Sequence, residues 1–213
     1  MGLDFVAVDV ETANAFRGSV CQVGLVSVRN GRVVDEWVSM LQPPTGHCWV
    51  DVDRGQVHGF TTQLLAQQPG FDSVWPAVLQ RLWGQMLVAH NAGFDLSALQ
   101  EASVEGGFGE LDVDYVCSLV LARRHLELPT HTLDAVAAEC GVRLEHHHDA
   151  LADARAAAEI TLALAARVDA HSVTELLAAS GVSLGHSGGG LTRPCRAIST
   201  QPVVRVDVEP RLF

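Results

Sequence analysis

The sequence contains no lysine, so arginine supplies all 14 of its basic residues and lysine is excluded as a catalytic group. Long apolar runs are missing too. The most apolar stretch, residues 156–168, is interrupted by Glu159 and Arg167, whereas a membrane span needs roughly 18 or more apolar residues in succession. No basic segment with a cleavage site precedes the first apolar run, and we therefore expect a cytoplasmic protein without a membrane span.

Cysteine pairs of the C-x-x-C type are absent, and the five cysteines are odd in number. Both features argue against a disulfide framework and against structural zinc. An excess of positive charge is missing as well, because the formal net charge is −11. Proteins that coat nucleic acid electrostatically are basic. Either nucleic acid is not the partner, or the acidic residues gather at a site that divalent metals neutralise.

What the sequence does contain suffices for one compact domain, since 48% of its 213 residues are hydrophobic. Three strand-like runs open the chain at residues 5–10, 23–28 and 33–38, and Asn30-Gly31 between the last two is a strong hairpin signal. Further strands are expected at 86–89 and from 113, and helices at 61–83, 94–102, 133–140, 149–168 and 172–179. This order predicts an α/β domain with a mixed sheet.

The composition changes after Gly181, and we place the end of the folded domain at residue 182. Residues 183–213 are expected to form a linker and a C-terminal tail, because His186 to Gly190 reads His-Ser-Gly-Gly-Gly, a flexible composition. Residues 203–208 have the composition of a single strand within this tail. The prediction is thus a folded domain over residues 1–182, followed by a flexible segment.

Asp9 and Glu11 stand at the end of the first predicted strand. Residues two apart in a strand point to the same face, so these carboxylates would converge beside the sheet. An apolar strand that ends in two acids needs a cation or protons to relieve their repulsion. The pattern Asp-x-Glu is common by chance, however, and its meaning depends on acids elsewhere in the chain.

Two further acids follow later in the chain. Asp95 comes after a strand-like run and enters a helix, a place where acids also occur simply because they stabilise the helix N-terminus. Asp153 lies about one turn into the alanine-rich helix, while His148 stays on the preceding loop. His146 and His147 are readily explained as surface histidines, since three adjacent histidines rarely all face one metal.

Together the four acids predict a site for hard divalent cations. Oxygen ligands select Mg²⁺ or Mn²⁺ over zinc, and four carboxylates without a nearby lysine favour two ions. Two ions about 3.5–4 Å apart can clamp the attacking and the leaving oxygen of a phosphodiester. The neutral imidazole of His148 could accept the proton of the attacking water, which is worth on the order of 10²–10⁴ in rate.

Three segments resemble the motifs of the DEDDh family of 3′→5′ exonucleases: Asp9-Val10-Glu11-Thr12, His-Asn-Ala-Gly-Phe-Asp at 90–95, and His-Asp-Ala-Leu-Ala-Asp-Ala at 148–154. A Val-His-Gly-Phe-Thr segment at 57–61 also resembles the family. The likeness covers about residues 3 to 168 and is greatest to the proofreading epsilon subunit of bacterial DNA polymerase III and its free-standing relatives. Each motif alone is weak, but the ordered set is specific.

The resemblance implies a ribonuclease-H-like fold, in which a mixed five-stranded sheet is flanked by helices. It also implies a role for each matching residue. The metals would be bound by Asp9, Glu11, Asp95 and Asp153, with His148 as the general base. The substrate would be contacted by Thr12, Asp53, His58, Phe60 and Asn91. One departure is Cys117, which stands where relatives often carry aspartate; it affects a local hydrogen bond rather than the metal site.

The implied activity is release of nucleoside monophosphates from single-stranded 3′ ends, with DNA as the expected polymer. Three alternatives stay open. An RNA-trimming ribonuclease or oligoribonuclease fits as well, because nothing in the sequence reads a 2′-hydroxyl. A proofreading subunit would need a polymerase partner. A catalytically silent adaptor belongs to another class, and the presence of all five catalytic residue types argues against it.

The end of the chain suggests one further partner. Residues 209–213 read Glu-Pro-Arg-Leu-Phe, which resembles the short peptides ending in Leu-Phe that dock on bacterial sliding clamps. The predicted linker would give this peptide reach. A tail with no binding function is the simpler interpretation of the same residues.

Overall fold

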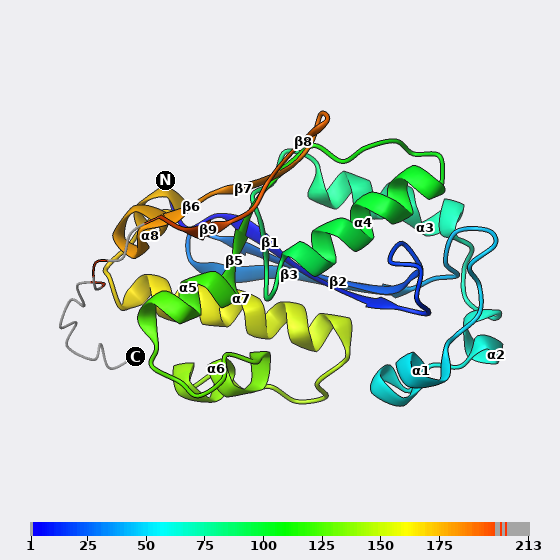
Figure 1. Cartoon of the computed structure of the whole chain (residues 1–213), viewed down its shortest axis with the longest axis horizontal. Coiled ribbons are helices and arrows are strands. Elements are labelled where there is room, and N and C mark those ends of the chain that lie inside the picture. The colour runs from blue at the N-terminus through cyan, green and yellow to red at the C-terminus, as the bar shows by residue number, and fades with distance from the viewer. Residues whose placement is uncertain (1, 199–200, 202, 204–213) are drawn as a thin grey trace.

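The computed structural model describes residues 2–198, 201 and 203. Its centre is a seven-stranded mixed sheet with the strand order β3-β2-β1-β4-β5-β7-β8 (Figure 1). The strands are β1 Phe5–Thr12, β2 Val20–Arg29, β3 Arg32–Met40, β4 Leu87–Ala89, β5 Val113–Cys117, β7 Gly185–Gly188 and β8 Leu191–Arg193. Two short strands, β6 Val182–Ser183 and β9 Arg196–Ala197, pair separately. The predicted α/β fold with a mixed sheet is confirmed, but the sheet has seven strands rather than five, because β7 and β8 of the C-terminal region extend it beyond β5.

The three opening strands form an antiparallel meander, as the sequence predicts. Asn30 and Gly31 at the second turn have φ values of 50° and 72°. Positive φ at both central residues is what a tight hairpin turn matching the strand twist requires, and Asn-Gly adopts it at little cost. On its other side β1 pairs in parallel with β4, so β1 lies inside the sheet.

Helices cover both sides of this sheet. They are α1 Val52–His58, α2 Thr62–Leu65, α3 Phe71–Leu82, α4 Gly93–Glu105, α5 Ser118–His125, α6 Leu133–Cys140, α7 Ala150–Ala166 and α8 Val173–Ser180. In Figure 1, α3 and α4 lie above the central strands, while α5, α6 and α7 lie below them. The sequence does not predict α1. Among the described residues, none of the helices combines the length and apolarity that a membrane crossing needs.

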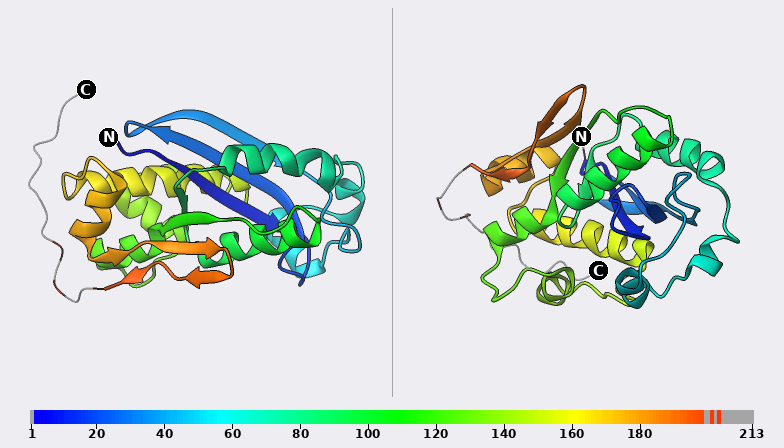
Figure 2. Two further views of the ribbon diagram at one scale, coloured as in Figure 1. Left: turned by 90° about the horizontal axis from the view of Figure 1, so that it is seen from above. Right: turned by 45° about the vertical axis from the view of Figure 1, so that its right-hand side comes forward.

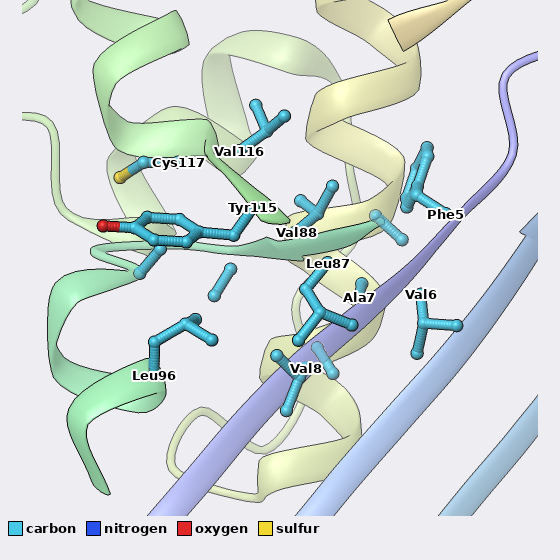
Figure 3. Close-up of a cluster of buried hydrophobic side chains, with 14 of the residues drawn as sticks. Phe5, Val6, Ala7, Val8, Leu87, Val88, Leu96, Tyr115, Val116 and Cys117 are labelled. Atoms are coloured by element: carbon cyan, nitrogen blue, oxygen red, sulfur yellow. The ribbon is translucent and has the colours of Figure 1, made fainter. Parts of the chain in front are cut away.

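The core lies around β1. Figure 3 shows residues 5–8 of β1 beside Leu87 and Val88 of β4, and all of these side chains are buried. Full burial of one large apolar side chain stabilises the folded state by roughly 1.5–3 kcal/mol. The apolar half of β1 thus fixes the strand in the core, and its last residues bring Asp9 and Glu11 to the end of that core.

The C-terminal part of the described chain differs from the expected linker. The segment His186–Gly190 belongs to a hairpin, in which β7 pairs with β5 and β8 pairs with β7 (Figure 2). The glycines at 188–190 all have positive φ, so they form its turn. Glycine-rich sequence suits a tight turn as well as a linker, and composition alone does not separate the two. The strand expected over 203–208 lies, apart from residue 203, outside the described residues, as does the tail at 209–213.

Candidate metal and active site

The first two acids of the site lie where β1 leaves the core. Asp9 and Glu11 are half-buried and alternate with the buried residues of the strand. One carboxylate oxygen from each lies within 4.8 Å of the others in a cluster that also includes Asp153 of α7. The strand alternation therefore brings Asp9 and Glu11 together as the sequence predicts, and the packing of α7 on β1 adds Asp153.

Asp95 lies in the first turn of α4 and is only 3% exposed. Its Oδ1 accepts a hydrogen bond from the backbone N–H of Val10, at 3.2 Å. Val10 is the residue between Asp9 and Glu11, so this bond fixes α4 against the acidic end of β1. The sequence motif at 90–95 thus has two roles: it forms the start of α4, and it brings the carboxylate of Asp95 next to the acidic end of β1.

Asp153 lies in the first turn of α7 and is 4% exposed. Nδ1 of His147 lies 3.0 Å from its Oδ1 and 2.9 Å from its Oδ2. The backbone N–H of His148 donates to the same Oδ2 at 3.1 Å. The loop that precedes α7 therefore folds back over Asp153.

The histidine loop, residues 142–149, has an irregular backbone. His146 and His148 have φ values of 57° and 71°, a conformation that L residues other than glycine rarely adopt. The rings of His147 and His148 stack with their centroids 3.9 Å apart. His147 is exposed, as the sequence suggests, but the interpretation as a mere surface residue is corrected by its contact with Asp153.

A buried glutamine connects the start of α7 to the sheet. Nε2 of Gln22 on β2 donates to Oδ2 of Asp149 at 3.1 Å, and Oε1 of Gln22 accepts from the backbone N–H of Ala150 at 3.0 Å. Asp149 also caps the helix, because its Oδ1 accepts from the N–H groups of Leu151 and Ala152. Gln22 is not among the site residues that the sequence predicts. Its sequence signal is weak, because Ser27 and Arg29 are also polar residues of β2.

Electrostatics make the acidic cluster unstable on its own. Burial, followed by the charges of Asp95 and Asp153, raises the pKa of Asp9 well above its usual range. Burial and the same two neighbours raise the pKa of Glu11 to about 8, against which the charge of Arg54 acts. Burial raises the pKa of Asp95 to about 8 as well, although its bond from Val10 opposes the shift.

Such a cluster takes up protons or cations to relieve the repulsion between its carboxylates. All of its donor atoms are carboxylate oxygens, which are the ligands that hard divalent cations prefer. The residues present therefore fit a divalent metal. The imidazole next to them fits a base, because burial and the charge of His147 lower the pKa of His148 and favour its neutral form.

The residues expected to contact substrate are distributed around this cluster. Thr12 is buried at the end of β1, and His58 ends α1 with its ring 4.5 Å from that of Phe60. Nε2 of His58 is buried and has no hydrogen-bond partner among the described residues. Asn91 is exposed and has a φ of 68°. Thr12 and His58 lie near one another, because the backbone of Thr12 acts on the pKa of the His58 imidazole.

Asp53 differs from these residues. It is exposed in the first turn of α1, and within the described part of the chain no hydrogen bond or ion pair joins it to the others. The next residue, Arg54, is not among the predicted site residues either, although its charge reaches Glu11. An isolated arginine on an unpredicted helix offers no sequence signal of its own.

Residues 6–161 match the family model RNase T, whose description is Exonuclease. The chain is 28% identical over 174 residues to a DNA polymerase III of the PolC type from Thermotoga maritima. The matched region covers 81% of this chain and 12% of that protein. It is also 31% identical over 186 residues to a Mycobacterium tuberculosis protein named as a bifunctional exonuclease/endonuclease. That match covers 81% of this chain and 28% of the relative. The chain therefore spans a small part of both relatives.

Solved structures with a similar fold include exonuclease X in complex with 5′ overhanging duplex DNA. It has a TM-score of 0.61 at 22% identity and covers 75% of this chain and 90% of that one. Exonuclease I has a TM-score of 0.67 at 14% identity and covers 83% and 43%. These likenesses show that the chain shares its fold with both proteins.

Proposed function

The chain belongs to the RNase T exonuclease family, and from this premise we propose that it is a two-metal-ion 3′→5′ exonuclease acting on single-stranded DNA ends. The product would be nucleoside monophosphates. The observation that carries the proposal is the convergence of Asp9, Glu11 and Asp153 within 4.8 Å, with Asp95 bonded to the strand between the first two.

Each residue has a defined part in this proposal. The carboxylates of Asp9, Glu11, Asp95 and Asp153 would hold two ions, which we propose to be Mg²⁺ or Mn²⁺. Bound there, the ions supply the charge that activates the attacking water and offsets negative charge on the leaving 3′ oxygen. The neutral imidazole of His148 accepts the proton of that water. His147 and Gln22 position the loop and the helix that carry His148 and Asp153.

The terminal nucleotide is proposed to lie against His58 and Phe60. The half-buried imidazole of His58 would lie beside the nucleotide, and the ring of Phe60 offers a stacking surface for a base. Thr12 and Asn91 would line the same site. Asp53 is held in the proposal only as a residue of the outer rim, because it is exposed on α1.

DNA is proposed as the polymer because the names of the similar proteins refer to DNA. The relatives include DNA polymerase III of the PolC type, and solved neighbours include E. coli exonuclease I in complex with a dT13 oligonucleotide. The PolC likeness also favours a second candidate, proofreading in association with a polymerase. A sliding-clamp contact through residues 209–213 would belong to this second candidate, and it rests on the sequence of the tail alone.

The test is degradation of matched single-stranded DNA and RNA oligonucleotides that carry a label at either the 3′ or the 5′ end. With Mg²⁺ or Mn²⁺ the full chain should release the 3′ label first, as a mononucleotide, and should act faster on DNA. EDTA should stop the reaction. Release of the 5′ label first would contradict the polarity, and faster loss of RNA would favour the ribonuclease reading.

A matched pair of variants ties the activity to the site. Asp9→Asn should remove it, whereas Asp35→Asn, an exposed acid on β3, should leave it unchanged. Clamp binding is tested separately, by comparing the full chain with a version that lacks residues 212–213. Equal affinity of the two for a purified sliding clamp would remove the tail from the proposal.

A further inference from the structure

Two arginines lie against the same aromatic ring beside the acidic cluster. The guanidinium carbon of Arg17 is 5.3 Å from the centroid of the Phe94 ring, and that of Arg54 is 5.9 Å away. Both distances are within the range of a cation–π contact. Phe94 immediately precedes Asp95, one of the proposed metal ligands.

The three residues come from separate parts of the fold. Arg17 lies in the loop between β1 and β2, Arg54 lies on α1, and Phe94 lies in the first turn of α4. Three segments distant in sequence thus meet at one ring. The charge of Arg54 also opposes the rise in the pKa of Glu11, which places this arginine within electrostatic reach of the cluster.

The hydrogen-bonding capacity of both arginines is largely unused. Within the part of the chain that the structure describes, Arg54 has no hydrogen bond or ion pair, although the protein has an excess of acidic residues. Arg17 donates one bond, from Nη1 to Oγ of Ser97 at 3.0 Å. A guanidinium carries five N–H donors, so most of them point to no protein acceptor.

Charge balance indicates what these donors serve. Two divalent ions would just neutralise the four carboxylates of the site, which leaves no net positive charge for the rest of a bound strand. Each further phosphate of the strand carries one negative charge and approaches a protein with a net charge of −11. A guanidinium binds phosphate oxygens in a bidentate geometry, and stacking on a ring holds its plane in place before the ligand arrives.

We propose that Arg17 and Arg54, held by the Phe94 ring, form a clamp for a backbone phosphate upstream of the scissile phosphodiester. This proposal rests on the proposed nuclease function and adds a binding subsite to it. The clamp binds the strand and leaves the scissile phosphate to the metal site. Its loss therefore raises KM more than it lowers kcat.

Substrate length separates the clamp from the metal site. A dinucleotide has only the scissile phosphodiester, whereas a hexanucleotide also has upstream phosphates. The R17Q/R54Q double variant should lose about tenfold or more in kcat/KM on the DNA hexanucleotide, mainly through KM, because charge-assisted hydrogen bonds are lost. At saturating Mg²⁺, which offsets the lost charge of Arg54 near Glu11, its activity on the dinucleotide should stay close to that of the wild type.

Two measurements sharpen this test. The slope of log KM against log salt concentration on the hexanucleotide should become shallower by about 0.7 in the double variant if one phosphate contact is lost. Arg81→Gln is the matched control. Arg81 of α3 also lies over an aromatic ring, that of Trp37 on β3, but it does not belong to the proposed clamp. It should behave as wild type, and thermal unfolding of each variant checks the fold.

The outcomes are distinct. Equal losses on the dinucleotide and the hexanucleotide, or no loss on either, would overturn the clamp while the nuclease proposal stands. A wild-type chain that cleaves no strand with any divalent metal would overturn the proposed function itself, and the clamp with it. A loss confined to the longer substrate supports both.

Discussion

The acids of the site and its histidines reach the same place by different means. Asp9 and Glu11 lie on a strand that is paired on both sides, and Asp95 and Asp153 lie in the first turns of helices packed on that strand. The histidine loop, in contrast, has left-handed backbone at two non-glycine residues. Regular elements therefore fix the acids, while side-chain contacts hold the histidines.

The acidic cluster and the histidine loop also differ in what raises the free energy of the folded state. The acids are destabilised by burial and by one another, and a cation removes that cost. The loop has backbone conformations that cost on the order of 1–2 kcal/mol per residue, which contacts to Asp153 offset. Changes among the acids should thus alter metal binding and activity, whereas changes in the loop should alter catalysis alone.

The largest expected effect is that of Asp9→Asn. Removal of one charge from the cluster should lower kcat/KM by about 10³-fold or more, since several kcal/mol of metal-based transition-state stabilisation are lost. The same change should raise the melting temperature in EDTA, because it removes like-charge repulsion. Activity assays and calorimetric melting of the same samples test this. A variant that loses activity and also melts lower without metal would contradict the electrostatic account.

His148→Ala should lower kcat by about 10²–10⁴ while leaving Mn²⁺ affinity unchanged. Asp153→Ala should lose both. Because the pKa of His148 is lowered by burial and by His147, the rising limb of the wild-type pH–rate profile should lie below the ordinary histidine value of about 6.5. Full activity of His148→Ala, or loss of its Mn²⁺ binding, would contradict the assignment of proton transfer to the histidine loop and of metal binding to the acids.

Metal removal should give the protein an unusual pH dependence of stability. The folded-state pKa values of Glu11 and Asp95 are about 8, whereas carboxyl groups in unfolded chains titrate near about 4. The stabilisation of the protonated forms is fully present below about pH 4 and is lost as pH rises towards 8. The slope per group is at most about 1.4 kcal/mol per pH unit.

Denaturant unfolding in EDTA at pH 5, 6.5 and 8 measures this effect. We expect stability to fall across the series, and saturating Mg²⁺ at pH 8 to restore it. The Asp9→Asn variant should show a flatter dependence. Stability that rises between pH 5 and 8 in EDTA would contradict the raised pKa values.

The smallest effect is expected for Gln22→Ala. It leaves the N–H of Ala150 without its partner and should cost roughly 1–3 kcal/mol of unfolding free energy. Because α7 carries Asp153 and follows His148, kcat should also fall, by less than in His148→Ala. Ser27→Ala, elsewhere on β2, is the control. An unchanged kcat with reduced stability would make Gln22 purely structural.

The same contrast explains how much the sequence predicts. Strand alternation and apolar patterning predict β1, the hairpin at Asn30-Gly31 and the helix over residues 133–140, because these follow from local rules. The contacts of Gln22 with Asp149 and of Arg54 with Phe94 join distant segments. The contact of His147 with Asp153 spans only six residues, but it depends on the irregular backbone of the histidine loop. No local pattern encodes them, and they become visible only once the sheet and α7 are in place.

The hairpin of β7 and β8 shows the same limit. Its glycines suit either a linker or a turn, and the pairing of Val113 with Ser187 decides between them. The candidate acids were accessible from sequence because their motifs are short and ordered. The assignment of their roles stays a prediction.

The most direct test of the central claim is the number of Mn²⁺ ions that the full chain binds, measured by isothermal titration calorimetry at pH 7.5 for wild type and Asp9→Asn. We predict two ions per wild-type chain, weakened or lost binding in Asp9→Asn, and unchanged binding in Asp35→Asn. A wild-type chain that binds no Mn²⁺, or an Asp9→Asn variant that binds it as well as the wild type, would contradict the account.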